Sequence, residues 1–158
     1  MSETPEKKRG VRLSPEDAWA MVAESHTGIF TTLKRDGTPI ALPVWFALVD
    51  GCIWTSTPER SKKIARIRNN PRASFLVESG ELWRELKAVH LTGTADIPTV
   101  STEDEKRIRG VMDAKYSPYR TQNTKMPSSA TKAYANMILV RFTPDERIVS
   151  WSNAQLMG

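Results

Sequence analysis

Two Asp-Gly pairs constrain the fold of this chain most, because each stands between runs of β-branched, aromatic and aliphatic residues. The first, at residues 36–37, follows residues 28–33, and the second, at residues 50–51, separates residues 40–49 from residues 52–57. Asp-Gly favours the tight turn that joins two antiparallel strands. The sequence therefore predicts two successive hairpins that form an antiparallel meander.

The middle strand of this meander contains a proline. Pro43 cannot donate a backbone hydrogen bond to a ladder, so its position predicts a sheet edge, a bulge or a bend. Val44, Trp45 and Phe46 follow it, which puts large side chains beside backbone polar groups that the ladder does not use. Such a segment could line a planar heterocycle, and core packing beside a bulge is the simpler alternative.

Further strands and a few helices follow from the hydrophobic periodicity. The first helix is predicted to begin at Pro15, with Ser14 as its N-cap. The remaining predicted elements are helices over 58–69 (capped by Thr57 or Ser61) and 102–115, strands over 72–77 and 86–97, and a closing hairpin of 135–142 with 147–151. Residues 116–131 show no regular pattern, which predicts a long loop or lid. Short strands with tight turns and few helices predict a mainly β protein, an antiparallel barrel of six to seven strands.

A length of 158 residues fits one domain. Residues 1–12 are polar and basic and are predicted to be a flexible tail, which leaves residues 13–158 as a single domain. No apolar run approaches the roughly 18 residues of a membrane-spanning helix, and no secretion signal is visible, so a cytoplasmic protein with no membrane partner is expected. One cysteine, Cys52, and two histidines give no reason to expect a disulfide or a metal site.

The formal net charge of +5 suits an anionic partner, and one segment concentrates cations where an anion can bind. Hydroxyl residues end a predicted strand and cations open the following helix; these candidate phosphate-binding residues are Thr55, Ser56, Thr57, Arg60, Ser61, Lys62 and Lys63. A helix N-terminus offers unpaired N–H groups and the positive end of the helix dipole, so a bound anion would explain cations at that position. A solvated basic face with an ordinary N-cap fits the same pattern.

Other partner and site classes have less support. The cations do not line one helix with interleaved aromatic residues, so nucleic acid is not expected as a partner. The chain has no Walker loop and no GxGxxG, GxSxG or HExxH motif, which excludes the commonest nucleotide, dinucleotide and hydrolase sites. His26 and His90 lie far apart in the sequence, and neither is expected to be catalytic.

The meander, the proline-containing strand and the hydroxyl–cation segment together resemble the split β-barrel flavin and deazaflavin proteins, the pyridoxamine 5′-phosphate oxidase-like superfamily. The resemblance covers about residues 13–152. It is carried by the order and spacing of residues 27–33, 35–39, 43–46, 54–57, 61–63, 70–74 and 93–95. It implies an FMN-binding type of split barrel and a homodimer with two cofactor sites at the subunit interface.

The resemblance also implies roles for the two candidate segments. Pro43, Val44 and Trp45 would lie against the ring system of the cofactor, and the hydroxyl–cation segment would hold its phosphate. The partner subunit would complete the site through residues 83–87 or through the segment around Trp151.

Two departures from the family narrow the expected function. Pyridoxamine-phosphate oxidases carry an Arg-Gln pair where this chain has Lys87-Ala88, and an Arg-x-His segment near the end where this chain has residues 151–156. Residues 27–74 look more like the branch that uses the deazaflavin coenzyme F-420, although FMN-using relatives share much of this stretch. The expected function is an oxidoreductase that passes a hydride from reduced F-420 to an unsaturated or electron-poor small-molecule substrate. An FMN-dependent oxidoreductase and a non-catalytic flavin- or haem-binding protein are the alternatives.

No side chain of the protein is required as an acid or base in this chemistry, because such a cofactor itself carries the redox step. If a side chain does take part in proton transfer, the predicted loop 116–131 is the place to look. Tyr116 and Tyr119 are the candidates there.

Overall fold

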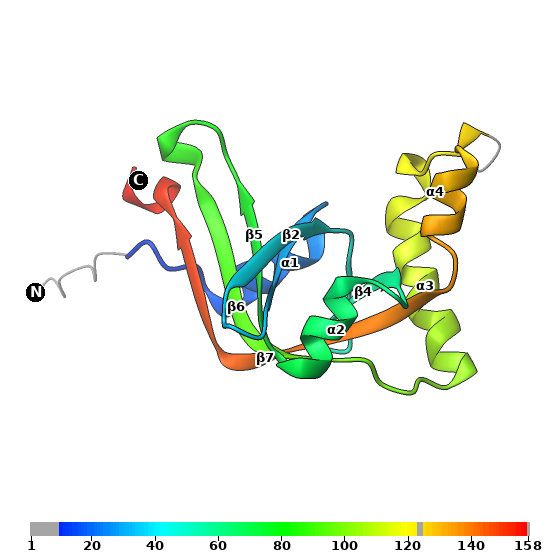
Figure 1. The fold of residues 1–158 in the computed structure, drawn as a ribbon. Coiled ribbons are helices and arrows are strands. Elements are labelled where there is room, and N and C mark those ends of the chain that lie inside the picture. Colours follow the sequence, from blue (N-terminus) through cyan, green and yellow to red (C-terminus); the bar gives the residue numbers. More distant parts are fainter. Residues whose placement is uncertain (1–9, 123–124, 158) are drawn as a thin grey trace, which may run out of the picture.

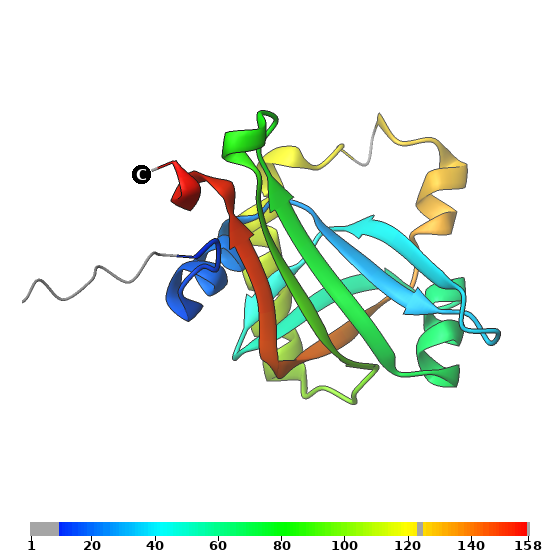
Figure 2. The same ribbon diagram turned by 90° about the vertical axis from the view of Figure 1, so that its left-hand side faces the viewer.

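The computed structural model describes residues 10–122 and 125–157, and its centre is one curled antiparallel sheet (Figure 1). The strands are β1 (Gly28–Leu33), β2 (Pro39–Val44), β3 (Ala47–Val49), β4 (Cys52–Pro58), β5 (Arg72–Ser79), β6 (Lys87–Asp96) and β7 (Met137–Ser152). Hydrogen-bonded neighbours follow the order β2-β1-β5-β6-β7-β4-β3, and every pair is antiparallel. The sheet curls into an open barrel (Figure 2), which confirms the predicted mainly β split barrel.

Helices cover the outside and one end of this sheet. They are α1 (Pro15–Glu24), α2 (Lys62–Asn69), α3 (Thr102–Tyr116), α4 (Ser128–Ala133) and the 3-10 helices η1 (Trp83–Glu85), η2 (Ser117–Tyr119) and η4 (Asn153–Leu156). α2 packs against β1 and β6, and α3 packs against β3. Over 10–122 and 125–157, no helix combines the length and apolar character that crossing a membrane requires.

The interior of the barrel is filled by aromatic side chains. Phe30, Phe46, Phe75 and Phe142 are each at most 1% exposed, and their ring centroids lie 4.8–6.1 Å apart in tilted or edge-to-face pairs. A second cluster lies under α3, where Ile108 and Met112 pack with apolar residues of β3, β4 and β7. Because the interior is packed with side chains, a ligand site has to lie at the rim or on the outer face of the sheet.

Both Asp-Gly hairpins are confirmed. β1 pairs with β2 across the turn that contains Gly37 (φ 85°), and β3 pairs with β4 across Asp50 (φ 53°) and Gly51 (φ 74°). Positive φ is readily reached by glycine and tolerated by aspartate, which is why these two residues make the turn.

The prediction of a single strand over 40–49 is wrong in one respect. It is two strands, β2 and β3, which lie at opposite ends of the sheet order, and the chain leaves the sheet between them at Trp45 and Phe46. The edge expected from Pro43 is confirmed, since β2 is the first strand of the sheet. Proline has no backbone N–H to donate to a neighbouring strand, which fits its position in an edge strand.

The closing hairpin predicted from 135–142 and 147–151 is also wrong. These residues form one long strand, β7, which pairs with β6 over most of its length and with β4 over residues 137–142. Between the pairs Leu91–Ile148 and Gly93–Pro144 the register advances two residues on β6 and four on β7. The turn-like residues 144–147 therefore form a bulge that bends a continuing strand.

Gly93 explains why the strands stay close at this bulge. A Cβ atom on Gly93 would collide with the backbone oxygen of Thr143 and approach the Phe142 ring within 2.9 Å. Glycine at this position lets β7 turn across β6 without losing the pairing on either side.

The predicted loop over 116–131 is only partly irregular. Tyr116 is the last residue of α3 and is fully buried, η2 follows it directly, and α4 begins at Ser128. Tyr116 continues the apolar face of Ile108 and Met112 at four-residue spacing, a helical signal that extends past Lys115. Residues 123–124 lie outside the described residues.

The predicted tail, residues 1–12, falls mostly outside the described residues, since the description begins at Gly10. The first described residues are hydrogen-bonded to the end of β7. Val11 O accepts a hydrogen bond from Ser152 N at 2.7 Å, and Leu13 N donates to Ser150 Oγ at 3.1 Å.

Candidate functional site

The N-terminus of α2 lacks the stabilising groups found at the other long helices. α1 and α3 each begin with a serine, Ser14 or Ser101, whose hydroxyl accepts a backbone N–H, and each has acidic residues in its first turn. α2 also follows a serine, Ser61, but that side chain makes no cap hydrogen bond, and the first turn holds no acidic residue. Lys62 and Lys63 open the helix instead. Unpaired N–H groups and two cations at the positive end of a helix dipole form a site for an anion.

The predicted start of this helix is wrong by four residues. Pro58 still belongs to β4, and α2 begins at Lys62, so Ser61 rather than Thr57 occupies the N-cap position. The Ser61 hydroxyl points back toward the strand, where its Oγ lies 3.2 Å from Thr57 Oγ1. Two hydroxyl groups and the start of α2 therefore converge, as the candidate phosphate segment requires.

Lys63 is a partly buried amine in this site. Its Nζ lies 5.8 Å from the centroid of the Phe30 ring, and burial, together with the charge of Arg66, lowers the pKa of its amine below the ordinary value. A lowered pKa means that the protonated amine lacks compensation for its lost hydration. An anion bound beside it would supply that compensation.

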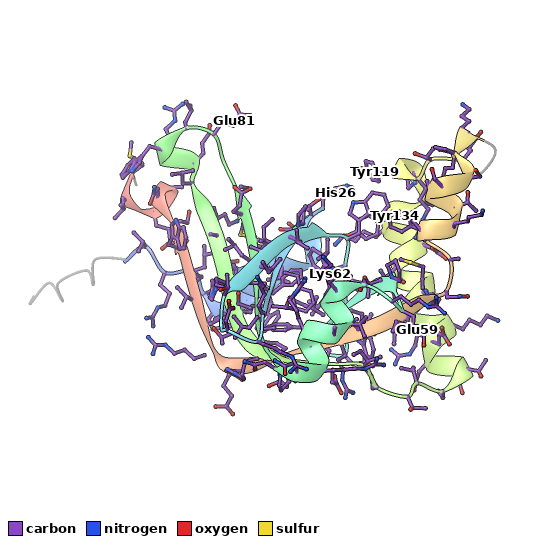
Figure 3. All side chains as sticks on the ribbon, viewed as in Figure 1. His26, Glu59, Lys62, Glu81, Tyr119 and Tyr134 are labelled. Atoms are coloured by element: carbon purple, nitrogen blue, oxygen red, sulfur yellow. The ribbon has the colours of Figure 1, made fainter. Side chains whose placement is uncertain are left out.

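The other candidate phosphate residues do not all lie together. Thr55 and Thr57 are buried, with 2% and 5% exposure. Ser56 faces the other side of β4, where it accepts a 3.4 Å hydrogen bond from Arg109 Nη1 of α3, because successive strand residues alternate between faces. The structure therefore does not bring the Ser56 side chain together with the two threonines. Lys62 is exposed at the start of α2 (Figure 3).

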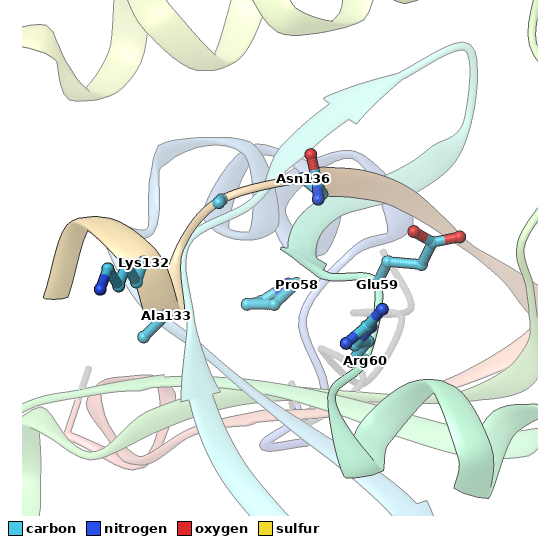
Figure 4. Close-up of a pocket in the computed structure, with 7 residues that line it drawn as sticks. Pro58, Glu59, Arg60, Lys132, Ala133 and Asn136 are labelled. Atoms are coloured by element: carbon cyan, nitrogen blue, oxygen red, sulfur yellow. The ribbon is translucent and has the colours of Figure 1, made fainter. Parts of the chain in front are cut away.

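Arg60 lines a pocket of about 310 Å³ between the end of β4 and α4 (Figure 4). The opposite wall includes Lys132 and Asn136, and Glu59 N donates to Asn136 O at 3.2 Å. The pocket holds more positive than negative side chains. Sequence reasoning missed Lys132, since nothing in its local pattern places α4 beside β4.

The candidate ring segment lies at the edge of the sheet. Pro43 and Trp45 are exposed, and Val44 is turned into the core with 9% exposure. Val44 pairs with Gly28 at the start of β1, and among the described strands β2 pairs with β1 alone. The outer edge of β2 therefore leaves backbone polar groups available, as an approaching ring system requires.

Tyr116 holds the break that follows this segment. Its hydroxyl accepts a hydrogen bond from Phe46 N at 2.8 Å and lies 2.9 Å from Phe46 O and 2.8 Å from His26 O, to which it can donate. Its ring stacks on Trp45 at 4.5 Å with an interplanar angle of 4°. Burial raises the pKa of the Tyr116 hydroxyl, so this group stays protonated. Tyr116 thus supports the chain at the candidate ring segment rather than lining an open loop.

Two further residues lie near the site and were not predicted from the sequence. Arg66 Nε donates to the buried Thr32 Oγ1 at 2.7 Å, which attaches α2 to β1 beside Lys63. Arg66 falls three residues after Lys63 on the helix, and that spacing is the signal that could have revealed their shared face.

Lys115 is the second residue missed. Its Nζ lies 3.8 Å from the centroid of the Phe46 ring and donates to Phe46 O at 3.2 Å, and burial lowers its pKa to about 8. The lysine is thus a second partly desolvated cation near the β2–β3 break.

The lowered pKa of Lys115 predicts a pH-dependent stability. The unfolded lysine keeps its proton up to about its ordinary pKa of 10.5, whereas the folded one loses it near pH 8. The unfolded state therefore binds more protons between these values, and the free energy of unfolding rises with pH there. Lys115→Met should remove about 1 kcal/mol of this rise, a value that allows for solvent screening at a half-exposed position. Urea unfolding at pH 8 and pH 10 measures the change in the free energy of unfolding. Lys106→Met, on the same helix, is the control. A pH dependence in Lys115→Met equal to that of the original protein would contradict the prediction.

The two segments expected to reach a partner subunit lie side by side in one projecting arm, formed by η1, the ends of β6 and β7, and η4 (Figure 1). Asn153 connects them, since its Nδ2 donates to Trp83 O at 2.8 Å and its backbone N donates to Leu86 O at 2.9 Å. The arm exposes large apolar side chains, among them Leu82 (53%), Trp83 (61%), Trp151 (38%) and Leu156 (53%). An apolar concentration of this kind is typical of a contact surface.

Comparison with known proteins relates this fold and these segments to a family. The family model of pyridoxamine 5′-phosphate oxidase matches residues 14–144. No curated protein matches the chain.

Solved structures with the same fold include three of different kinds. A conserved hypothetical protein from Mycobacterium tuberculosis is 28% identical, with a TM-score of 0.77 over 97% of this chain and 94% of that one. An FAD-binding protein from Mesorhizobium loti is 19% identical, with a TM-score of 0.67 over 87% and 94% of the two chains. An F420 reductase is 16% identical, with a TM-score of 0.63 over 86% and 98%. The family model covers nearly the whole barrel, from the N-cap of α1 to the bulge of β7, and the chain therefore belongs to the pyridoxamine 5′-phosphate oxidase family of flavin-binding split barrels.

Proposed function

We propose that the protein is an oxidoreductase that binds reduced deazaflavin coenzyme F-420 and delivers its hydride to an electron-poor small molecule. The observation that carries the proposal is the start of α2, which has no side-chain cap, no acidic residue in its first turn and two lysines. A phosphate bound there would satisfy the N–H groups, the dipole and the cations together.

The residues that would hold the phosphate are those that converge at this helix start. Lys62 and Lys63 would provide charge, Thr57 and Ser61 would provide hydroxyl donors, and Arg60 borders the same segment. The partly buried amine of Lys63 adds to this support, because a bound anion would compensate the charge for its lost hydration.

The ring system would lie at the edge of β2, against Pro43, Val44 and Trp45. The two parts of the site border the same strand, since Lys63 lies over Phe30 and Val44 pairs with Gly28, two residues away along β1. Two strand residues span about 7 Å. One elongated ligand with a phosphate at one end and a planar ring at the other would fit this arrangement.

When bound, the deazaflavin supplies the hydride chemistry, and the protein supplies orientation and exclusion of water. Within the described chain, the side chains at the start of α2 would fix the phosphate. The edge of β2, supported by Tyr116 from behind Trp45, would orient the ring. Sequence resemblance over 27–74 favours F-420, and an FMN-dependent oxidoreductase is the second candidate because FMN presents the same phosphate-and-ring chemistry.

Fluorescence titration of the purified protein with F-420 and with FMN tests the proposal. Micromolar binding of F-420, weakening as salt rises, is the expected result because the ligand is anionic. Oxidation of reduced F-420 on addition of an electron-poor acceptor would then separate an enzyme from a carrier. Binding of FMN alone would replace the proposal with an FMN oxidoreductase, and binding of neither would favour a non-catalytic protein.

A second copy of the chain would complete the site, through the apolar arm. The arm projects from the barrel (Figure 1) and carries the exposed Trp83 and Trp151, and the sequence resemblance to the split-barrel superfamily implies a homodimer as the assembly that would cover it.

Trp83→Glu places a charge in this arm and is expected to weaken dimerisation about tenfold, because a charge must be desolvated in an apolar contact. Sedimentation velocity over a concentration series measures the change. Glu81→Gln, in the same loop, is the control and should leave the equilibrium within twofold of the original. A dimer of unchanged stability in Trp83→Glu would place the interface elsewhere.

A further inference from the structure

We propose that Trp45, Tyr119 and His26 form a binding site for the ring of a planar aromatic small molecule, the acceptor that would receive the hydride. The identity of this ligand as the acceptor rests on the proposed function. The binding of a planar ring does not, and it can be measured without cofactor.

Four rings from separate segments meet beside the break between β2 and β3. Two of them, His26 and Tyr119, are labelled in Figure 3. His26 precedes β1, Trp45 follows β2, Tyr116 ends α3 and Tyr119 ends η2. The His26 ring contacts all three others edge-on, at 5.8 Å from Trp45, 5.4 Å from Tyr116 and 4.5 Å from Tyr119. The rings lie at the distances at which aromatic groups attract one another.

The outer rings of this cluster face solvent. Trp45 remains 36% exposed and Tyr119 62% exposed, and His26 is also exposed. Tyr116 covers one face of the Trp45 indole, so the exposed area belongs to the remaining surface of that ring. A planar ligand can stack on this surface and meet the edges of His26 and Tyr119, which is the geometry that aromatic pairs prefer.

The cluster is held in place before any ligand binds. Tyr116 is fully buried, and its hydroxyl contacts the backbone of His26, a member of the cluster, and of Phe46, the residue after Trp45. Trp45 is therefore supported by a ring that cannot move without breaking those hydrogen bonds. Binding to side chains that are already ordered loses less conformational entropy, which favours a binding role over a loosely packed surface.

The position selects the class of ligand. Trp45 is the last residue of the segment proposed for the cofactor ring, so a molecule stacked on its outer face would lie next to a cofactor ring held along Pro43, Val44 and the near edge of the indole. The surface offers aromatic faces and edges, and these discriminate planar aromatic rings from saturated rings of equal size.

Benzonitrile and cyclohexanecarbonitrile are matched probes, because both are neutral and differ in whether the ring is planar and aromatic. Saturation-transfer NMR on the full chain without cofactor should detect benzonitrile binding in preference to the saturated analogue. Trp45→Leu should weaken benzonitrile binding about fivefold, which corresponds to the stacking energy of one aromatic pair.

Two control variants make the test specific. Val111→Ala shortens an exposed apolar side chain (40%) on α3, outside both the aromatic cluster and the arm, and should leave binding unchanged. Lys62→Ala should also leave it unchanged, which separates this site from the phosphate site. Tyr119→Leu, at an exposed position, provides a second weakening variant if Trp45→Leu does not fold.

Equal binding of the two nitriles, or equal loss in Trp45→Leu and Val111→Ala, would overturn the inference, because either result means non-specific apolar adsorption. Unchanged affinity in both cluster variants would overturn it as well. A protein that binds neither F-420 nor FMN but shows the predicted nitrile preference would refute the proposed function and keep the aromatic-ring site.

Discussion

Replacing Lys62 by alanine is expected to weaken F-420 binding by about 1.5–3 kcal/mol, a loss of about 10- to 150-fold, because one charge-assisted hydrogen bond to phosphate is removed. Lys62 is exposed at the first position of α2, so its side chain contributes little to the packed core. The free energy of unfolding should therefore change by less than about 0.5 kcal/mol. Fluorescence titration and urea unfolding of the same variant measure the two quantities separately.

The matched control is Lys106→Ala, which removes the same charge from an exposed position on α3. It should lower affinity only through the long-range field, by a small factor that vanishes at high salt. Equal losses in the two variants would mean that the protein attracts the cofactor through net charge alone. Unchanged affinity in Lys62→Ala would mean that Lys62 does not bind the phosphate and belongs to a solvated basic surface.

Local signals were sufficient for much of the fold. Each Asp-Gly pair makes its turn through its own backbone preferences, so both hairpins could be predicted without knowing what packs around them. The edge position of β2 follows equally from Pro43 itself. These features depend on a few consecutive residues, and that is why they could be predicted.

The errors concern contacts between distant segments. Residues 144–147 have the composition of a turn, and only the pairing with β6, with Gly93 opposite, makes them a bulge in a continuous strand. The lack of a regular pattern over 116–131 predicts Tyr116 in a loop, whereas its burial depends on Phe46 and His26, 70 and 90 residues away. No local pattern reports such partners.

The candidate site also has parts that follow from local sequence and parts that depend on contacts between distant segments. The hydroxyl–cation segment predicted that hydroxyl groups and cations would meet at the start of a helix, and Ser61 does lie beside Thr57 there, although the helix begins four residues later than predicted. Successive residues of a strand point to opposite faces, and this alternation predicts that the Ser56 side chain lies apart from those of Thr55 and Thr57, as the structure shows. Arg66, Lys115 and Lys132 were missed, because their places depend on which elements pack together.

Tyr116→Phe is expected to lower the free energy of unfolding by about 1–3 kcal/mol, since it leaves buried backbone groups without their partner. The hydroxyl accepts from Phe46 N and can donate to Phe46 O or His26 O, all within 2.9 Å, at a residue with no exposed surface. The ring itself is kept, so packing against Trp45 is nearly unchanged and the loss reports the hydrogen bonds. Urea unfolding at neutral pH gives the value.

Tyr119→Phe is the natural comparison, because it removes the same atom from a tyrosine that is 62% exposed in the same cluster, and it should change stability by less than about 0.5 kcal/mol. Equal stability of the two variants would mean that water or a shifted backbone replaces the Tyr116 hydroxyl. If the hydroxyl does hold the 45–46 break, Tyr116→Phe should also broaden the indole N–H resonance of Trp45, while Tyr119→Phe should not. The hydroxyl of one buried tyrosine would then stabilise the barrel and also order the surface on which a ring is expected to stack.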